Sequence, residues 1–191
     1  MNVVSVIRWS IIPTLCITLL GCDVVKLDAN GRPIIPMSAE EAASLTNLEP
    51  QQIADKLWDA ILQEAESTDA VSAPQQETAF IRISGTVISV DDSKKAATMT
   101  VQTKSYGDVT VQIGPIVRGN AIRDAASFIH FDDFKNQVQF ARLSKELNKK
   151  ALQGITRPDS SWQGSQVDIL AAATVKETMV SGVIPLDMVK R

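Results

Sequence analysis

The side chains that could support acid–base or metal chemistry are few in this sequence. His130 is the single histidine, so a catalytic triad, a dyad or a histidine-bound zinc would have to use it. Asp132 follows two residues later, and in an extended segment this spacing would point both side chains to one side, as a pair of metal ligands. Two ligands with no third in view are weak evidence for a metal site. A packed or solvent-facing histidine is the better explanation.

The carboxylates are spread along expected turns and helix starts, where capping explains them. The close pairs are Asp91 with Asp92, in an expected hairpin turn, and Asp132 with Asp133, at an expected helix start. General acid–base catalysis would need two groups in different environments within reach of one substrate. The serines lack a candidate base, and no glycine-rich phosphate loop follows a strand. We therefore expect no catalytic residue, no metal site and no cofactor, and we expect the protein not to be an enzyme.

Cys22 ends a short apolar stretch near the start of the chain. Residues 9–20 are mostly apolar, a run too short for the roughly 20 residues that a membrane-spanning helix needs. The pattern is typical of a secretory signal. Gly21 before Cys22 resembles the bacterial lipobox, whose cysteine is acylated on sulfur and becomes the first residue. We predict that residues 1–21 are a lipoprotein signal peptide and that Cys22 is the lipidation site; an ordinary thiol after a signal cleaved elsewhere is the alternative.

Lipidation of Cys22 would decide both the thiol chemistry and the location of the protein. Cys16 would leave with the signal, so no free thiol would remain for disulfides, thiol catalysis or metal binding. Several acyl chains anchor a protein stably, because each buried methylene contributes about 0.8 kcal/mol. Asp23 resembles the signal that retains lipoproteins on the periplasmic side of the inner membrane in enteric-type bacteria. The outer membrane is the alternative location.

The charge pattern argues against nucleic acid as a partner. Losing Arg8 with the signal takes the formal net charge from −3 to −4. The basic residues are scattered, so the mature chain lacks the basic patch that binds nucleic acid. Binding to anionic lipid beyond the anchor itself is likewise not expected.

Two segments precede the expected barrel domain. Residues 22–37 contain several turn formers, which indicate an extended leader. Residues 38–78 are expected to hold a small helical subdomain and a linker. Pro50 suits the first turn of one helix, and the apolar residues of that helix recur every four positions. They are Ile53, Leu57 and Ile61. Such a stripe must pack on another helix or on the next domain.

Residues 79–191 contain strand patterns on both sides of a helix pattern. The segments AFIRISGTVISV, AATMTVQ and DVTVQI alternate apolar and polar residues, which predicts three half-buried antiparallel strands. Gly85, inside the first, indicates a bend or bulge. Two more strands, QVDILAAATV and SGVIPLDMV, are expected at the end of the chain.

A long helix is expected between the third and fourth strands, from about Asp132 or Asp133 to about Leu152. Gly154 and Pro158 should stop it. Two apolar sets give it a wide face that we expect to be buried. They are Phe134 with Val138 and Ala141, and Phe140 with Leu143 and Leu147. Three strands, a helix and two strands are the order of an OB-type barrel. We therefore predict an α+β fold, with a small N-terminal helical subdomain followed by an OB-like five-stranded antiparallel barrel.

The run QIGPIVRGNAIRDAASFIHFDDFKNQVQFARLSKELN, residues 112–148, resembles the hallmark of a family of predicted periplasmic lipoproteins of unknown function. Members are often encoded beside sugar ABC transporters, and they are similar in having a small helical subdomain followed by an OB-like barrel. The resemblance extends from VVKLD through LWDAILQEAE to VIPLD. It implies an ABC transporter component or a sugar-binding protein as the partner. The stretch between Trp58 and Phe80 is shorter than the family leads us to expect, which implies a reduced helical subdomain.

The most distinctive polar residues of that run are Arg118, Arg123 and Asp124. A buried polar network fixing the junction of the third strand and the helix is the favoured interpretation. The alternative is a fork of arginines that recognises a carboxylate or phosphate on a partner.

Tyr106 and Trp162 are the aromatic residues that fall in predicted loops, and a sugar site would need such a platform. Each is more simply explained as a plug that packs into the barrel. Two functions follow. The first is a non-catalytic, membrane-anchored accessory module that binds a protein partner. The second is a barrel that binds a sugar or a related small solute.

Overall fold

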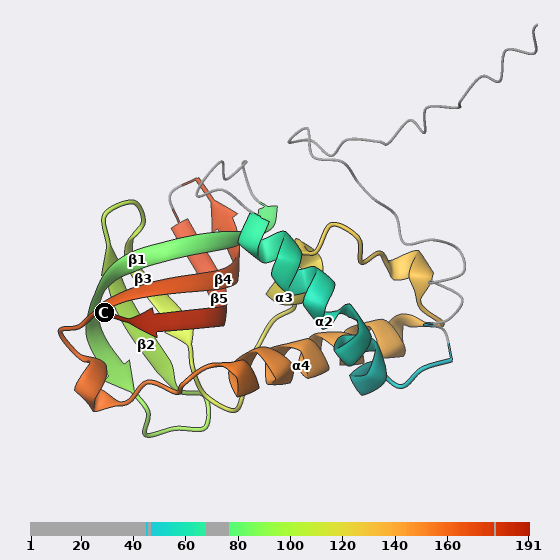
Figure 1. Ribbon diagram of the computed structural model, residues 1–191, viewed down its shortest axis with the longest axis horizontal. Coiled ribbons are helices and arrows are strands. Elements are labelled where there is room, and N and C mark those ends of the chain that lie inside the picture. The colour runs from blue at the N-terminus through green and yellow to red at the C-terminus, as the bar shows by residue number, and fades with distance from the viewer. Residues whose placement is uncertain (1–44, 46, 68–76, 178) are drawn as a thin grey trace, which may run out of the picture.

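The computed structural model describes residues 45, 47–67, 77–177 and 179–191 (Figure 1). The predicted signal peptide, Cys22, Asp23 and the leader lie outside the described residues. None of the helices in the described ranges combines the length and the apolar character that a membrane-spanning helix requires.

Five strands close into a barrel in the order β1-β2-β3-β5-β4 (Figure 1). Their bounds are Glu77–Asp91 (β1), Thr98–Thr103 (β2), Gly107–Gln112 (β3), Gln166–Lys176 (β4) and Met179–Lys190 (β5). All neighbours pair antiparallel except β3 and β5, which pair in parallel. The expected all-antiparallel barrel is therefore corrected to a mixed one. The long connection between β3 and β4 lets β5 return alongside β3 in the same direction, which a chain of hairpins would not do.

β1 curls so that it pairs with β4 along its first part and with β2 along its second part. Gly85 lies where the two ladders overlap, opposite both Thr103 and Val167. A Cβ atom at Gly85 would lie 2.2 Å from the carbonyl oxygen of Gln102, so only glycine allows this close approach. The register shift itself comes slightly later, between Val87 and Ser89.

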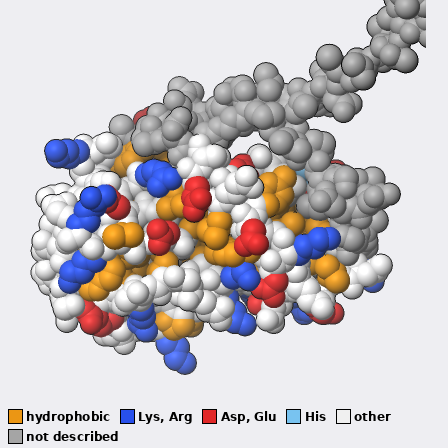
Figure 2. Space-filling model, in the orientation of Figure 1, with side chains coloured by type: hydrophobic (Ala, Val, Ile, Leu, Met, Phe, Trp, Pro, Cys, Tyr) orange, Lys and Arg blue, Asp and Glu red, His pale blue; other side chains and the backbone are white. Residues whose placement is uncertain are grey.

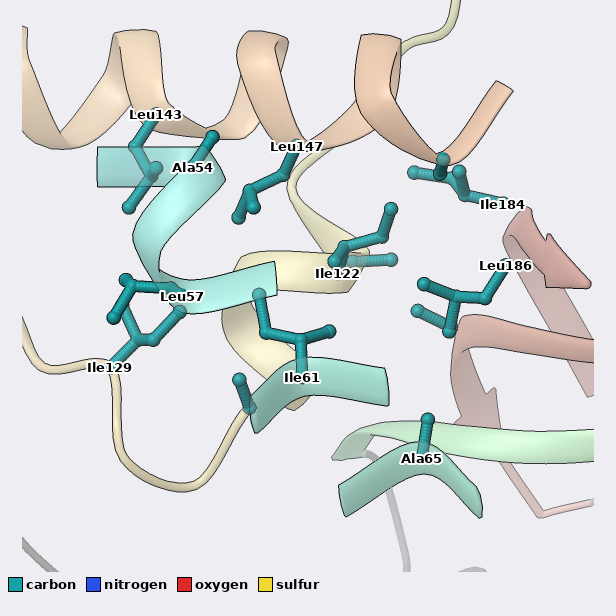
Figure 3. Close-up of a cluster of buried hydrophobic side chains, with 14 of the residues drawn as sticks. Ala54, Leu57, Ile61, Ala65, Ile122, Ile129, Leu143, Leu147, Ile184 and Leu186 are labelled. Atoms are coloured by element: carbon teal, nitrogen blue, oxygen red, sulfur yellow. The ribbon is translucent and has the colours of Figure 1, made fainter. Parts of the chain in front are cut away.

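The described helices lie to one side of the barrel (Figure 1). They are α2 (Pro50–Ser67), α3 (Ala121–Ala125) and α4 (Gln137–Gly154). Two short 3₁₀ turns complete the order: η1 (Phe131–Asp133) precedes α4, and η2 (Ser160–Trp162) precedes β4. α2 starts at Pro50 and buries the predicted stripe, which packs with α3, α4 and the outer surface of the barrel (Figure 3). The expected packing of this stripe on neighbouring elements is confirmed.

α4 begins later than the sequence analysis predicts. Asp132 and Asp133 belong to η1, and Asn136 caps α4 by accepting a 2.9 Å hydrogen bond from the Gln139 backbone N–H. An asparagine cap satisfies one of the free N–H groups of the first turn, which explains why the helix starts there. Val138 and Ala141 are exposed, so the expectation that they are buried is wrong. The end of the helix at Gly154 is as predicted.

Two apolar clusters hold the molecule together. The first fills the barrel interior mostly with small and β-branched side chains, among them Ile83, Val87, Val111, Ile169, Ala171 and Val183, together with Met99. The second lies between the helices and the outside of the barrel, and Figure 3 shows Ile122, Leu143, Leu147, Ile184 and Leu186 within it. β4 contributes to both clusters because its inward and outward residues are both apolar: Ala171 faces one and Ala172 the other.

Candidate functional site

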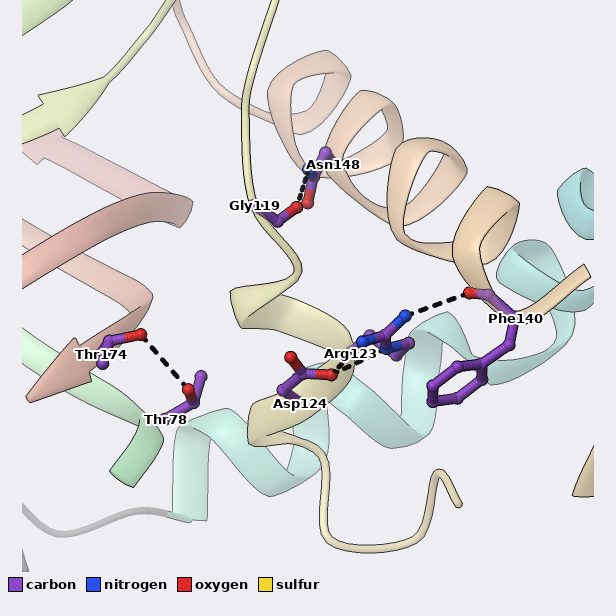
Figure 4. Close-up of polar contacts among 7 residues, drawn as sticks. All are labelled: Thr78, Gly119, Arg123, Asp124, Phe140, Asn148 and Thr174. Carbon is purple, nitrogen blue, oxygen red and sulfur yellow. Dashed lines mark hydrogen bonds and ion pairs between the residues drawn. The ribbon is translucent and has the colours of Figure 1, made fainter. Parts of the chain in front are cut away.

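Arg123 of α3 is buried, and its side chain points toward Phe140 of α4 (Figure 4). Its Nε donates to Asp124 Oδ1 at 2.7 Å, and its Nη2 lies 2.6 Å from the same oxygen. Its Nη1 donates to the Phe140 carbonyl oxygen at 3.3 Å. The guanidinium also stacks over the Phe140 ring, 3.8 Å from its centroid. The arrangement is that of a satisfied polar network joining two helices.

Asn148 makes a second contact at the junction of α3 and α4. Its side-chain amide donates to the Gly119 carbonyl oxygen at 3.0 Å (Figure 4). This hydrogen bond holds the loop between β3 and α3 against the middle of α4. It thereby fixes the position of α3, which carries Arg123.

Arg118 is placed differently from Arg123. Its side chain is exposed, whereas its backbone is held by the amide of Gln112, which accepts from the Arg118 N–H at 2.9 Å and donates to its carbonyl oxygen at 3.0 Å. Among the described residues, the Arg118 guanidinium has no ion-pair partner. No described contact joins it to Arg123 or Asp124, so the two arginines do not form one fork in this structure.

Three phenylalanines gather beside Arg123, and we call them the aromatic corner: Phe131, Phe134 and Phe140. The Phe131 and Phe140 rings meet edge to face with centroids 5.4 Å apart, and the Phe134 and Phe140 centroids are 5.1 Å apart. Phe131 is 50% exposed although it is a large apolar side chain. The corner therefore offers an exposed aromatic surface, and the cation–π contact between Arg123 and Phe140 holds its geometry.

His130 is exposed, at the start of η1, and its backbone N–H donates to Asp133 Oδ2 at 3.2 Å. The carboxylate of Asp133 thus caps the turn. Within the described part of the chain, no group of three or more His, Cys, Asp or Glu side chains is arranged to hold a metal ion.

Tyr106 and Trp162 both pack against the cluster inside the barrel. The Tyr106 hydroxyl is buried without a hydrogen-bond partner, and burial raises the pKa of this side chain. Trp162 is only 8% exposed, with the Lys190 Nζ 5.6 Å from its ring centroid. Both aromatic rings therefore pack into the barrel, and they do not form an exposed aromatic platform for a sugar.

A hollow of about 560 Å³ lies on the outer face of β1, β4 and β5, beside the end of α2. We call it the strand groove. It is lined by Glu66, Arg82, Ile83, Ser84, Asp168, Ile169, Leu170, Asp187, Val189 and Arg191. Figure 2 shows this side of the molecule, where acidic, basic and apolar side chains lie close together.

Part of the charge in the strand groove is already paired. Ser84 Oγ donates to Asp168 Oδ1 at 2.6 Å, and Arg191 Nε pairs with the other carboxylate oxygen. The Ser84 hydroxyl, and after it the Arg191 guanidinium, hold the pKa of Asp168 below its usual value. Arg82 Nη2 donates to the backbone carbonyl oxygen of Glu66 at 2.9 Å, which positions its guanidinium against the end of α2.

The strand groove is not predicted by any motif in the sequence. A partial signal was present in β1, where Arg82 and Ser84 occupy the outward positions of an alternating strand. The side chains that β5 contributes to the groove could not be predicted from its apolar and polar pattern. VIPLDM has four consecutive apolar residues, and a register shift opposite Leu170 and Ala171 decides which of them face outward.

The comparisons with known proteins agree with this fold. A family model described as "Predicted periplasmic lipoprotein (DUF2291)" matches residues 68–189. Among solved structures, the chain is similar to the crystal structure of an OB-fold protein from Thermotoga maritima. The two share 16% sequence identity with a TM-score of 0.50, over 76% of this chain and 99% of that chain. No curated protein matches the chain in sequence. The family resemblance and the OB-like fold predicted from the sequence are thereby confirmed.

Proposed function

This chain belongs to the family of predicted periplasmic lipoproteins, and we propose that it is a membrane-anchored, non-catalytic accessory module that docks a protein partner through the aromatic corner. The observation that carries the proposal is the half-exposed ring of Phe131 held against Phe140. An exposed aromatic side chain with a fixed geometry loses little conformational freedom when a partner covers it.

The surroundings of Phe131 suit a protein interface. Aromatic and arginine side chains are enriched in the centres of such interfaces, whereas most other charged side chains are depleted. In the aromatic corner, the charge of Arg123 is buried and already satisfied by Asp124 and the Phe140 carbonyl oxygen. A partner would therefore cover apolar area without having to desolvate that arginine.

The anchor would place this surface at the membrane. In the proposal, Cys22 carries the acyl chains, and Asp23 keeps the protein on the periplasmic side of the inner membrane. The partner is a component of a sugar ABC transport system, either the transporter itself or its sugar-binding protein, as the family resemblance implies. Tethering would raise the effective concentration of the module near a membrane-embedded partner.

The test is site-specific photocrosslinking in cells, with a photoreactive amino acid placed at Phe131. Val138 is the matched control. It is also exposed, at 59%, but it lies two residues before Phe140 on α4 and so points about 200° away around the helix axis. Lys145, another exposed position on α4, is a second control.

We expect one protein to crosslink from position 131 and not from positions 138 or 145, and mass spectrometry identifies it. A Cys22→Ser version of the same experiment separates docking from tethering, since it should weaken the crosslink without moving it to another position. No crosslink from position 131, or equal crosslinking from all three positions, would contradict the proposal.

A further inference from the structure

The strand groove holds two opposite charges on either side of an apolar residue. In the sheet register, Arg82 of β1 lies opposite Leu170 of β4, and Leu170 lies opposite Asp187 of β5. All three line the groove. Adjacent strands are 4.7–4.9 Å apart, so the Cα atoms of Arg82 and Asp187 are separated by about 10 Å. Leu170, which is 7% exposed, lies between them.

Both charges keep unused bonding capacity. Among the described residues, neither Arg82 nor Asp187 has an ion-pair partner. Arg82 uses one N–H on the Glu66 carbonyl oxygen, which leaves the rest of its five donors free in a fork suited to a carboxylate. The Asp187 carboxylate is an acceptor for an ammonium group.

Two of the other three charges of the groove already bind each other. Asp168 is bonded to Ser84 and Arg191, so that carboxylate and that guanidinium satisfy each other. Glu66 contributes a further carboxylate at the rim. The described lining residues include three acidic and two basic side chains, a balance that disfavours a polyanion such as a phosphorylated ligand.

We propose that the strand groove binds a zwitterion of about dipeptide size. Its carboxylate would bind the Arg82 guanidinium, its ammonium group would bind Asp187, and an apolar side chain would lie over Leu170 and Val189. The volume of about 560 Å³ is within the range of small-molecule sites. None of the described residues that line the groove is aromatic, which separates it from the stacking sites typical of sugars. This site is distinct from the aromatic corner and does not depend on the proposed partner.

The test is calorimetric titration of the full-length, detergent-solubilised lipoprotein with glycyl-leucine. Two blocked forms of the same ligand remove one charge each: N-acetyl-glycyl-leucine lacks the ammonium group, and glycyl-leucinamide lacks the carboxylate. Free glycine tests the required separation, because its two charges are too close together to reach both residues. We expect saturable binding of glycyl-leucine that is at least tenfold tighter than that of any of the other three, and that weakens as salt is added.

Matched substitutions locate the site. Arg82→Gln and Asp187→Asn should each weaken glycyl-leucine binding at least tenfold. Arg157→Gln and Asp108→Asn, which change exposed charges outside the groove, should leave it unchanged. The melting temperature of each variant checks that it is folded. The proposal is overturned if glycyl-leucine does not bind, if the blocked forms bind equally well, or if folded Arg82→Gln and Asp187→Asn variants keep wild-type affinity.

Discussion

The arginine of the aromatic corner and the arginine of the strand groove differ in burial and in the number of bonds that they make. Arg123 in the corner is buried, and its guanidinium is satisfied by Asp124, by a backbone carbonyl and by the face of Phe140. Arg82 in the groove is exposed and bonds one carbonyl oxygen. The first guanidinium therefore builds a rigid support for apolar surface, while the second remains available to a ligand. The number of bonds already made by a charged side chain decides which of these roles it can have.

The two surfaces share one core. Leu170, at the floor of the strand groove, belongs to the same apolar cluster as Leu147 of α4 and Ile122 of α3. The Phe134 ring of the aromatic corner also packs in this cluster. A change in the cluster should therefore affect both surfaces, whereas a change at one surface should leave the other intact.

The largest effect is expected from Leu147→Ala, which would test whether the helices and the barrel form one cooperative unit. Leu147 is fully buried between them (Figure 3), and loss of such a side chain costs about 2–5 kcal/mol of unfolding free energy. Met99→Ala, in the barrel interior, should cost a similar amount. In calorimetric unfolding, we expect each variant to show one transition, shifted to lower temperature. Val138→Ala is the exposed control and should shift it little. Two separate transitions, with Leu147→Ala lowering only one, would show that the two regions unfold independently.

An intermediate effect is expected from Arg123→Ala. It removes a buried network and leaves the Phe140 carbonyl oxygen without this donor, which costs about 1–3 kcal/mol. Arg118→Ala, at the exposed arginine of the same segment, should change stability by less than about 0.5 kcal/mol. Chemical denaturation of both variants measures the difference. Equal losses of stability would contradict the distinction between a buried support and an exposed arginine.

The smallest effect is expected from Asp168→Asn, and it should depend on pH. The Ser84 hydroxyl and the Arg191 guanidinium lower the pKa of Asp168 in the folded state. The carboxylate therefore stabilises the fold above the ordinary carboxyl pKa of about 3.9, and this stabilisation is lost as the pH falls through the lower folded value. On a partly exposed face it should amount to less than about 1 kcal/mol. Thermal melts from pH 6 downward should show a steeper decline for the wild type than for Asp168→Asn. Parallel curves would contradict this coupling.

Much of the fold follows from local sequence patterns. Period-two alternation predicted the first three strands, Pro50 marked the start of α2, and Gly154 marked the end of α4. The predicted start of α4 is wrong because two sets of possible cap residues lie close together in the sequence. Asp132 and Asp133 are good cap residues by type, but η1 uses them, and the cap of α4 is Asn136. Sequence alone does not rank neighbouring caps, because the choice depends on which start buries the apolar face.

The candidate sites were less predictable than the fold. The aromatic corner needs Phe131 of η1 to meet Phe140 of α4, and Phe140 to stack on Arg123 of α3, and no short pattern encodes these contacts. The strand groove needs three strands in a definite register, including a register shift in β5. Arg118 and Arg123, which are close in sequence, are separated by burial. Long-range packing decided each of these outcomes.

The most direct test of docking through the aromatic corner is the affinity for the protein that crosslinks from position 131, measured with purified components for the wild type and two single variants. If the partner docks through the aromatic corner, Phe131→Ser weakens binding at least tenfold, equivalent to about 1.4 kcal/mol, while Val138→Ser has wild-type affinity. Wild-type affinity of Phe131→Ser, or equal loss in both variants, would contradict docking through the aromatic corner.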